Sequence, residues 1–508
     1  MKFGPKSTAL AVLAAAAIAL TACGGGTNSG GNGGAAPTTL TLATLQDIKT
    51  FDPTDAHIGH RMPIYQAVYD SLIRRAPDGK LDPMLATEWS YNKDQTVLTL
   101  KLRTDVTFSD GAKFDAAAAK ANLDHFKDAK GQDAYQAASM KSVAVVDPST
   151  VAITLNSPDP AFSYYLTQAL GLQASPKAIG TDGIKTVPDG SGPYVYDAKS
   201  SVKGSQYVFT KRAGYWDKDL QKFDKVSFKY LVDLTARTNA LVSGQVDGAL
   251  LDPKTGKQAE GAGLVAHKSQ VDWQGILLYG RDGKISPALA NVKVRQAMNY
   301  AFDRKTILAQ QYLNEGTVTD QVFGPESGAY VPALDNTYPY DPAKAKALLA
   351  EAGYPQGFTL KIPTIAGYDA INAVFKQQLS DVGITLQTES IPDANYVADM
   401  AAGKYAGATF QLYQGEPWVA INQMVSTTAL YNPFKTEDPE LTALIKAVQN
   451  GGDKSADEAK KVNEYITKNA WFIPMFRLNQ MYFSSKKIDV QPQLQQAVPS
   501  IYNYAPAK

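Results

Sequence analysis

The first clear pattern in the chain is an alternation of hydrophobic and polar residues. Leu98, Leu100 and Leu102 alternate with polar neighbours, and a similar alternation runs through residues 143–155 on both sides of a turn at 147–150. Such alternation places one set of side chains on one face of a strand, and the Asp-Pro-Ser-Thr turn is typical of a chain reversal. We therefore predict a strand over 98–102 and a β-hairpin over 143–155.

A helical pattern follows in the second half of the chain. Asp341 is suited to cap a helix, Pro342 fits the first turn, and Gly353 can adopt the left-handed conformation at the end. The apolar residues between them recur at the spacing of one helical face: Ala345, Leu348, Leu349 and Ala352. The sequence predicts a helix from about Pro342 to Ala352.

Helix and strand patterns alternate over the region 285–420. They predict, in chain order, helices over 294–302, 371–382 and 396–400, and a strand over 408–412. The helix that ends at Gly383 leads directly into strand-like residues 384–386, which is the returning half of a βαβ unit. We expect this region to form an α/β lobe.

The N-terminus carries an export signal. Two lysines precede an apolar run over 9–20, which is too short to span a bilayer comfortably but suits a signal peptide. The small residues before Cys23 resemble the lipobox of bacterial lipoproteins, in which this cysteine is lipidated and becomes the first residue. We expect a signal peptide at 1–22, a lipid anchor at Cys23 and a flexible tether over 23–38.

Composition narrows the class of protein. The 508 residues are 44% hydrophobic, and 50 Lys and Arg nearly balance 49 Asp and Glu. This length predicts about two to four domains with a large core, and the balanced charge argues against nucleic acid as a partner. Removal of residues 1–22 takes away two lysines, so the net charge of +1 becomes −1. The single cysteine excludes an intramolecular disulfide and a Cys-based zinc site.

One loop offers possible metal ligands. His57 and His60 lie close to Asp52 and Asp55 in a segment interrupted by proline. Two imidazoles and two carboxylates could bind a transition metal if the loop folded around it. No third ligand cluster accompanies them, so a surface loop with incidental polar residues is the preferred interpretation.

A catalytic alternative rests on two short motifs. Ser200 and Lys203 form an S-x-x-K motif, and residues 254–256 form K-T-G, which are two parts of the penicillin-binding signature. The middle element of that signature is missing between them. The chain also lacks a nucleotide-binding P-loop and a G-x-S-x-G elbow. Ligand binding is therefore preferred to catalysis.

Six stretches occur in an order that resembles a known family. They are 78–103, 106–111, the Gly-Ser-Gly-Pro-Tyr loop at 190–194, the Gly-Tyr-Trp element at 214–216, 294–304 and 347–354. Together they resemble bacterial extracellular solute-binding proteins of the oligopeptide, dipeptide and nickel type (family 5), over the chain from about residue 40 to its end.

The resemblance implies an α/β, two-lobed periplasmic-binding-protein-like fold of type II, with a ligand cleft between the lobes. The first lobe would be enlarged by an extra subdomain. The expected boundaries are 39–75, 190–270 and 476–508 for the first lobe, 76–189 for the extra subdomain, and 271–475 for the second lobe.

The resemblance also implies where the ligand binds. Selectivity in the family usually resides in a cleft segment that corresponds here to 410–418, where peptide binders place an aspartate for the ligand's ammonium group. This chain has Gln414 and Gly415 there, and the nearest carboxylate is Glu416. The candidate ligand contacts are Tyr413, Gln414, Glu416, Trp418, Trp273, Tyr279, Arg281 and His57. The aromatic candidates could stack on a ligand or pack in the core.

The implied function is that of a monomeric, lipid-anchored receptor on the extracytoplasmic face of the membrane. It would deliver a peptide or peptide-like solute to an ABC permease with a separate ATPase, and it would use no cofactor, metal ion or catalytic residue. Oligosaccharides, opines and metal chelates remain alternative ligands within the family. An exported cell-wall hydrolase that uses Ser200 and Lys203 is an alternative of another class, and a sensor lipoprotein is a third.

Overall fold

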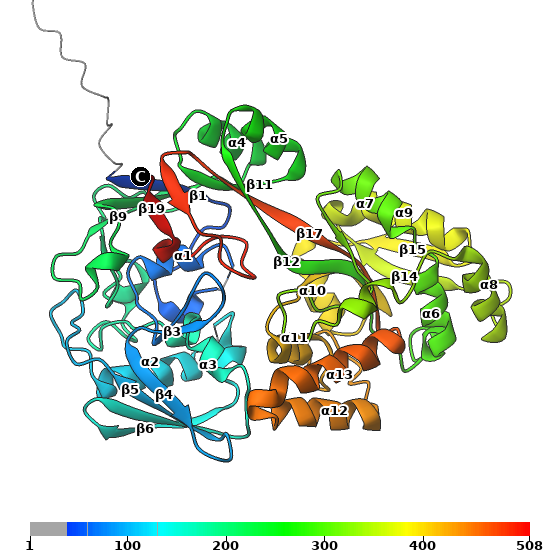
Figure 1. The fold of residues 1–508 in the computed structure, drawn as a ribbon, viewed down its shortest axis with the longest axis horizontal. Helices are drawn as coiled ribbons and strands as arrows, with labels where there is room; N and C mark the ends of the chain where they lie inside the picture. The colour runs from blue at the N-terminus through cyan, green and yellow to red at the C-terminus, as the bar shows by residue number, and fades with distance from the viewer. Residues whose placement is uncertain (1–37, 58, 130) are drawn as a thin grey trace, which may run out of the picture. The chain divides into compact units, whose positions relative to one another are not determined.

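The structure is a computed structural model that describes residues 38–57, 59–129 and 131–508 (Figure 1). The predicted signal peptide, Cys23 and all of the predicted tether except its last residue lie outside the described residues. Within the described part of the chain, no helix combines the length and the apolar character that crossing a membrane requires.

A nine-stranded sheet forms the centre of the fold. Its strand order is β16-β12-β17-β11-β1-β10-β9-β8, and β13 pairs with β17 outside this path. The strands are β1 Thr39–Thr44, β8 Tyr194–Tyr196, β9 Gln206–Lys211, β10 Lys225–Tyr230, β11 Gly248–Leu251, β12 Val265–Leu278, β13 Gly316–Val318, β16 Gly407–Tyr413 and β17 Phe472–Ser484.

Two long strands connect the two ends of this sheet. β12 has 14 residues and β17 has 13. The C-terminal end of β17 pairs with β11, whereas its N-terminal half pairs with β13 and the C-terminal half of β12 pairs with β16. Figure 1 shows β12 and β17 running from the elements around β1 to those around β14 and β15. We call these two groups the first and the second lobe.

The first lobe includes a separate antiparallel sheet of four strands in the order β4-β5-β7-β6. The predicted strand over 98–102 is confirmed as β5, and the predicted hairpin over 143–155 is confirmed as β6 and β7. The elements of this part are β4 Ala86–Tyr91, β5 Val97–Leu102, α2 Ala116–Asp128, β6 Met140–Asp147, β7 Thr150–Leu155 and α3 Phe162–Tyr165. The remaining first-lobe elements are α1 Met62–Gln66, β2 Ile73–Arg75, β3 Leu81–Pro83, α4 Leu234–Val242, α5 Pro253–Gly261, β18 Ile488–Val490 and β19 Tyr504–Pro506.

The second lobe contains the predicted βαβ unit. β14 and β15 are parallel neighbours, and α9 lies between them in the chain. The elements are α6 Val292–Tyr300, α7 Arg304–Tyr312, α8 Pro342–Glu351, β14 Thr359–Thr364, α9 Asp369–Ser380, β15 Thr385–Ser390, α10 Asp393–Ala401, α11 Pro417–Met424, α12 Pro439–Gln449 and α13 Ser455–Lys468. The predicted helices over 342–352, 371–382 and 396–400 are confirmed as α8, α9 and α10, and the strand over 408–412 as β16.

Local hydrogen bonds explain where these helices begin and end. The Asp341 carboxylate accepts from the backbone N–H of Lys344, as an N-cap does, and Gly353 follows α8 with a φ of 89°. The helix predicted over 294–302 begins and ends two residues earlier, as α6. Asp303 caps a second helix, α7, through the N–H of Thr306, so the chain leaves α6 before this cap.

The C-terminal segment returns to the first lobe after β17. β18 and β19 pair as an antiparallel ladder. In the loop between them, the N–H of Leu494 donates to the carbonyl of Pro77 at 2.9 Å, and Gln493 Nε2 donates to the carbonyl of Ala76 at 2.7 Å. These bonds fix residues 493–495 against the turn between β2 and β3.

Candidate ligand-binding cleft

Three adjoining hollows lie between the two lobes. We call them the amide chamber, the charged chamber and the outer chamber, with volumes of about 380, 400 and 290 Å³. Glu326, Leu494 and Gln495 line both the amide and the charged chambers. Glu416 and Pro417 line both the charged and the outer chambers. The shared walls show that the three hollows are neighbours along the cleft between the lobes.

Arg75, at the end of β2, supplies hydrogen-bond donors to the charged chamber. Its guanidinium lies over the ring of Tyr164, with 5.2 Å from Cζ to the ring centroid. Nη2 donates to Gln495 Oε1 at 2.9 Å. Nε and Nη1 are buried and have no hydrogen-bond partner among the residues that the structure describes. A planar guanidinium with two nitrogens that lack partners is suited to bind a carboxylate.

Glu416 supplies a carboxyl group to the same chamber. It is the N-cap of α11, and its Oε2 accepts from the N–H of Val419 at 2.7 Å. Burial raises the pKa of this carboxyl to about 7, although the backbone N–H groups of Val419 and Trp418 oppose the shift. The nearby Asp159 raises the pKa further, and Arg75 lowers it. Glu416 can therefore gain or lose its charge near neutral pH.

Asp159 approaches Glu416 from the first lobe. Its carboxylate accepts from Ser139 Oγ at 2.6 Å and from the N–H of Ala161 at 3.1 Å. Burial raises the pKa of Asp159 above its ordinary value, and hydrogen bonds from Ser139, Ala161 and Trp418 oppose this shift. Trp418 is 5% exposed, and it lies beside the cleft as a hydrogen-bond partner of Asp159.

Gln495 separates the amide chamber from the charged chamber. Its Oε1 accepts from Tyr413 OH at 3.1 Å as well as from Arg75, and its Nε2 donates to the carbonyl of Glu326 at 2.9 Å. Gln495 has a φ of 54°, in the left-handed region that costs a residue with a Cβ free energy. The strained backbone places one side chain in contact with both lobes.

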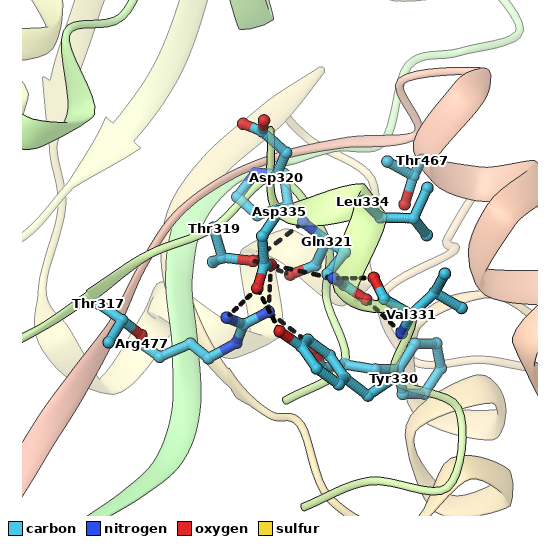
Figure 2. A network of polar contacts seen from close by, with 12 residues as sticks. Thr317, Thr319, Asp320, Gln321, Tyr330, Val331, Leu334, Asp335, Thr467 and Arg477 are labelled. Carbon is cyan, nitrogen blue, oxygen red and sulfur yellow. Dashed lines mark hydrogen bonds and ion pairs between the residues drawn. The ribbon is translucent and has the colours of Figure 1, made fainter. Parts of the chain in front are cut away.

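A buried polar network holds the loop that forms the second-lobe wall (Figure 2). Arg477 on β17 is 1% exposed; its Nη2 and Nη1 lie 2.7 and 3.1 Å from the two carboxylate oxygens of Asp335. Nη2 also donates to the carbonyl of Phe323 at 3.0 Å. Gln321 Nε2 and Tyr330 OH donate to Asp335 at 2.9 and 2.6 Å. The network thereby fixes the loop that carries Gly324 and Glu326 into the cleft.

The electrostatics of this network differ from those of the charged chamber. Burial would raise the pKa of Asp335, but the hydrogen bonds and charge of Arg477 outweigh burial and hold the pKa below its ordinary value. Asp335 is therefore ionised and paired over the physiological pH range.

The structure brings four of the predicted contacts together. Gln414 and Glu416 line the chambers, whereas Tyr413 and Trp418 line none of them and lie beside these two residues. Tyr413 OH accepts from the N–H of Glu416 at 3.1 Å and lies 3.5 Å from Tyr164 OH.

The other four predicted contacts lie elsewhere. Trp273 is fully buried against Phe472, and the buried Tyr279 donates its hydroxyl to Met400 Sδ. Arg281 lies 4.0 Å over the Trp471 ring and donates to Asn432 Oδ1 at 3.1 Å. His57 lies in the first lobe with Nδ1 2.9 Å from Asp133 Oδ1. None of the four lines the three chambers, so their role as ligand contacts stays a prediction.

The motifs outside the cleft can also be located. The described residues contain no group of three His, Cys, Asp or Glu placed to hold a metal ion. Ser200 lies in an exposed turn where its N–H donates to Asp197, and Lys254 lies in α5.

Sequence reasoning missed Arg75, Tyr164, Asp159 and Gln495. Arg75 and Gln495 are 420 residues apart, and neither belongs to a motif. Only the folded chain brings them together.

Known proteins resemble the chain in sequence and in fold. A sequence model of the bacterial extracellular solute-binding proteins, family 5, matches residues 80–431. The glutathione-binding protein GsiB of Escherichia coli strain K12 is 30% identical, over 81% of this chain and 86% of its own. The GsiB protein of Salmonella paratyphi A is 29% identical over 86% and 88%.

Solved structures share the fold. The periplasmic binding protein DppA from Helicobacter pylori, in complex with the peptide STSA, has a TM-score of 0.77 at 21% identity and covers 93% of this chain and 99% of its own. NikZ from Campylobacter jejuni, in complex with Ni(L-His), has a TM-score of 0.76 at 21% identity, with 92% and 99% covered. These likenesses confirm the two-lobed α/β fold. The chain belongs to the family 5 bacterial extracellular solute-binding proteins, the binding components of ABC transporters.

Proposed function

We propose that this protein captures a small zwitterionic solute, a peptide or peptide-like compound, and delivers it to an ABC permease. In this proposal Cys23 carries the lipid anchor and the protein acts as a monomer on the extracytoplasmic face of the membrane. The two lobes, with the boundaries expected from the sequence, close on the ligand by bending at β12 and β17.

The observation that carries this proposal is the opposite polarity of the two walls of the charged chamber. Arg75 offers two nitrogens without partners, Nε and Nη1, on one side, and Glu416 offers a carboxyl group on the other. A ligand carboxylate would pair with Arg75, and a ligand ammonium group would pair with Glu416. A solute that carries both charges therefore matches the chamber better than a neutral sugar.

Because Arg75 and Glu416 are in buried surroundings, they should discriminate between ligands that carry both charges and ligands that carry one. A buried charge without a partner costs several kcal/mol, so a ligand that supplies only one of the two charges leaves the other group unpaired. GsiB of Escherichia coli is named a glutathione-binding protein, and DppA of Helicobacter pylori was solved in complex with the peptide STSA. Glutathione and a free peptide carry both charges, which supports the proposal.

A thermal-shift and calorimetric comparison tests the charge requirement. The probes are tri-alanine, its N-acetylated amide, which has neither terminal charge, and maltotriose. We expect tri-alanine to raise the melting temperature and the blocked peptide and the sugar to leave it unchanged, because only a ligand of the folded state stabilises it. Equal binding of blocked and free peptide, or binding of maltotriose alone, would contradict the proposal.

A further inference from the structure

The amide chamber differs from the charged chamber in its chemistry. Five carboxamide side chains contribute to its wall: Gln270, Gln414, Asn479, Gln493 and Gln495. The one lysine of the wall, Lys268, is paired with Glu315 at 2.8 Å, and Glu326 is exposed at the rim. The inner wall of the chamber is therefore neutral but rich in hydrogen-bonding groups.

Nearly all of these amide groups already have partners in the fold. Gln270 Nε2 donates to Asn479 Oδ1 at 3.1 Å, and Gln270 Oε1 accepts from Thr317. Asn479 Nδ2 donates to Glu315 at 2.9 Å. Gln493 donates to the carbonyl of Ala76 and accepts from Asn503 at 3.0 Å. These side chains are fixed and have little capacity left for a ligand.

Gln414 is the exception. The residue is 2% exposed, and its Nε2 donates to the backbone carbonyl of Gln270 at 2.9 Å. A carbonyl oxygen can only accept, so this contact fixes which end of the amide points toward Gln270. The other end, Oε1, is buried and has no hydrogen-bond partner in the described chain. A buried acceptor left unpaired destabilises the protein and is unusual.

The neighbouring loop leaves room for the Gln414 side chain. A Cβ at Gly324 would lie 2.6 to 3.0 Å from the Gln414 amide group, so a larger residue there would displace this amide. Gly324 N also donates to the Gln414 carbonyl at 3.2 Å. The loop is the one held by Arg477 and Asp335, so the acceptor is in a fixed position before any ligand arrives.

We propose that the amide chamber is a second subsite, which binds an uncharged group that donates a hydrogen bond to Gln414 Oε1. A primary amide or a hydroxyl group has this chemistry. A carboxylate would be repelled by the acceptor, and an aliphatic group would leave it unpaired. This inference deepens the proposed function, because a peptide held by its ends in the charged chamber would pass a side chain beyond Gln495 into the amide chamber.

Isosteric side chains test the subsite. Gln and Met have similar lengths, but only Gln donates, so we substitute each of them in turn at the three positions of tri-alanine and measure affinity by calorimetry. At one position the Gln peptide should bind roughly tenfold more tightly than the Met peptide, as expected for one buried hydrogen bond. Equal binding of both peptides at all three positions would overturn the inference.

A matched pair of variants assigns the preference to one residue. Gln414→Met should abolish the difference between the Gln and Met peptides. Gln411→Met, three positions away at an exposed site of β16, should retain it. A preference that persists in Gln414→Met would also overturn the inference.

A second measurement keeps the subsite separate from the peptide proposal. Propionamide can donate a hydrogen bond, whereas N,N-dimethylpropionamide cannot, and saturation-transfer NMR detects weak binding of either to the unaltered protein. A signal for propionamide that is weak or absent for its dimethyl analogue, and lost in Gln414→Met, supports the subsite. No propionamide signal, or equal signals from both, contradicts it. If no tripeptide binds while propionamide gives the expected signals, the peptide proposal fails and the subsite stands.

Discussion

Two arginines on either side of the cleft illustrate different uses of a buried guanidinium. Arg477 on β17 has a carboxylate partner in Asp335, a carbonyl partner in Phe323, and a ring, Tyr330, 5.3 Å from Cζ. Arg75 on β2 also lies over a tyrosine ring, but among the described residues its guanidinium donates a hydrogen bond to Gln495 alone. The first forms part of the structure of the loop, whereas the second has N–H groups left for a ligand.

The difference separates stability from binding. A buried charge that the fold pairs with an opposite charge is costly to disturb, because removal of the partner leaves it uncompensated, although Nε of Arg477 itself has no partner among the described residues. A charge that the fold leaves partly unpaired lowers stability unless a ligand completes it. The same distinction holds for Asp335 and Glu416, because Arg477 lowers the pKa of the first, whereas burial raises that of the second to about 7.

The largest expected effect follows from disruption of the ion pair between Arg477 and Asp335. Asp335→Ala leaves the guanidinium of Arg477 buried without a counter-ion, so we expect a loss of about 3–5 kcal/mol in the free energy of unfolding, measured by urea denaturation. Asp82→Ala is the control, because Asp82 pairs with Arg74 in a half-exposed ion pair that contributes at most about 1 kcal/mol. If both variants lose the same small amount, the buried network does not hold the loop.

The next largest effect is a loss of ligand affinity when Arg75 is replaced. Arg75→Gln should weaken tri-alanine binding at least about tenfold, because a charged hydrogen bond to the ligand carboxylate contributes about 1.5–3 kcal/mol. Its melting temperature should stay close to that of the unaltered protein. Arg74→Gln, at the neighbouring position outside the three chambers, should bind normally. Unchanged affinity in Arg75→Gln would remove Arg75 from the site.

The smallest effect is a pH dependence that tests Glu416. Burial raises its pKa to about 7, so below that pH the carboxyl is protonated and cannot pair with an ammonium group. Affinity for tri-alanine should therefore rise about tenfold between about pH 5.5 and about pH 7. Glu416→Gln should bind with an affinity that varies little over this range, whereas Glu440→Gln, an exposed first-turn residue of α12, should keep the rise. A rise retained in Glu416→Gln would assign the titration to another group.

The elements that sequence predicted well are those fixed by local contacts. The α8 helix has its cap, its apolar face and its terminal glycine within a few residues of one another, and the β6–β7 hairpin has its turn between its strands. The end of α6 was misplaced because Ala301 and Phe302 are buried as the helical pattern requires, although they lie beyond the last helical residue. Burial alone does not distinguish a helix from the turn that follows it.

The sequence by itself determined the α/β class and the family, and it predicts an export signal with Cys23 and a ligand-contact segment with Tyr413, Gln414 and Glu416. Only the tertiary structure decided that Arg75, Tyr164 and Gln495 meet this segment, that Trp273, Tyr279 and Arg281 are buried away from the chambers, and that Gln414 keeps an unpaired acceptor. The physical reason is that motifs and periodicity record interactions between neighbours in the chain. Charge pairing and hydrogen-bond saturation depend on which distant segments the sheet brings together.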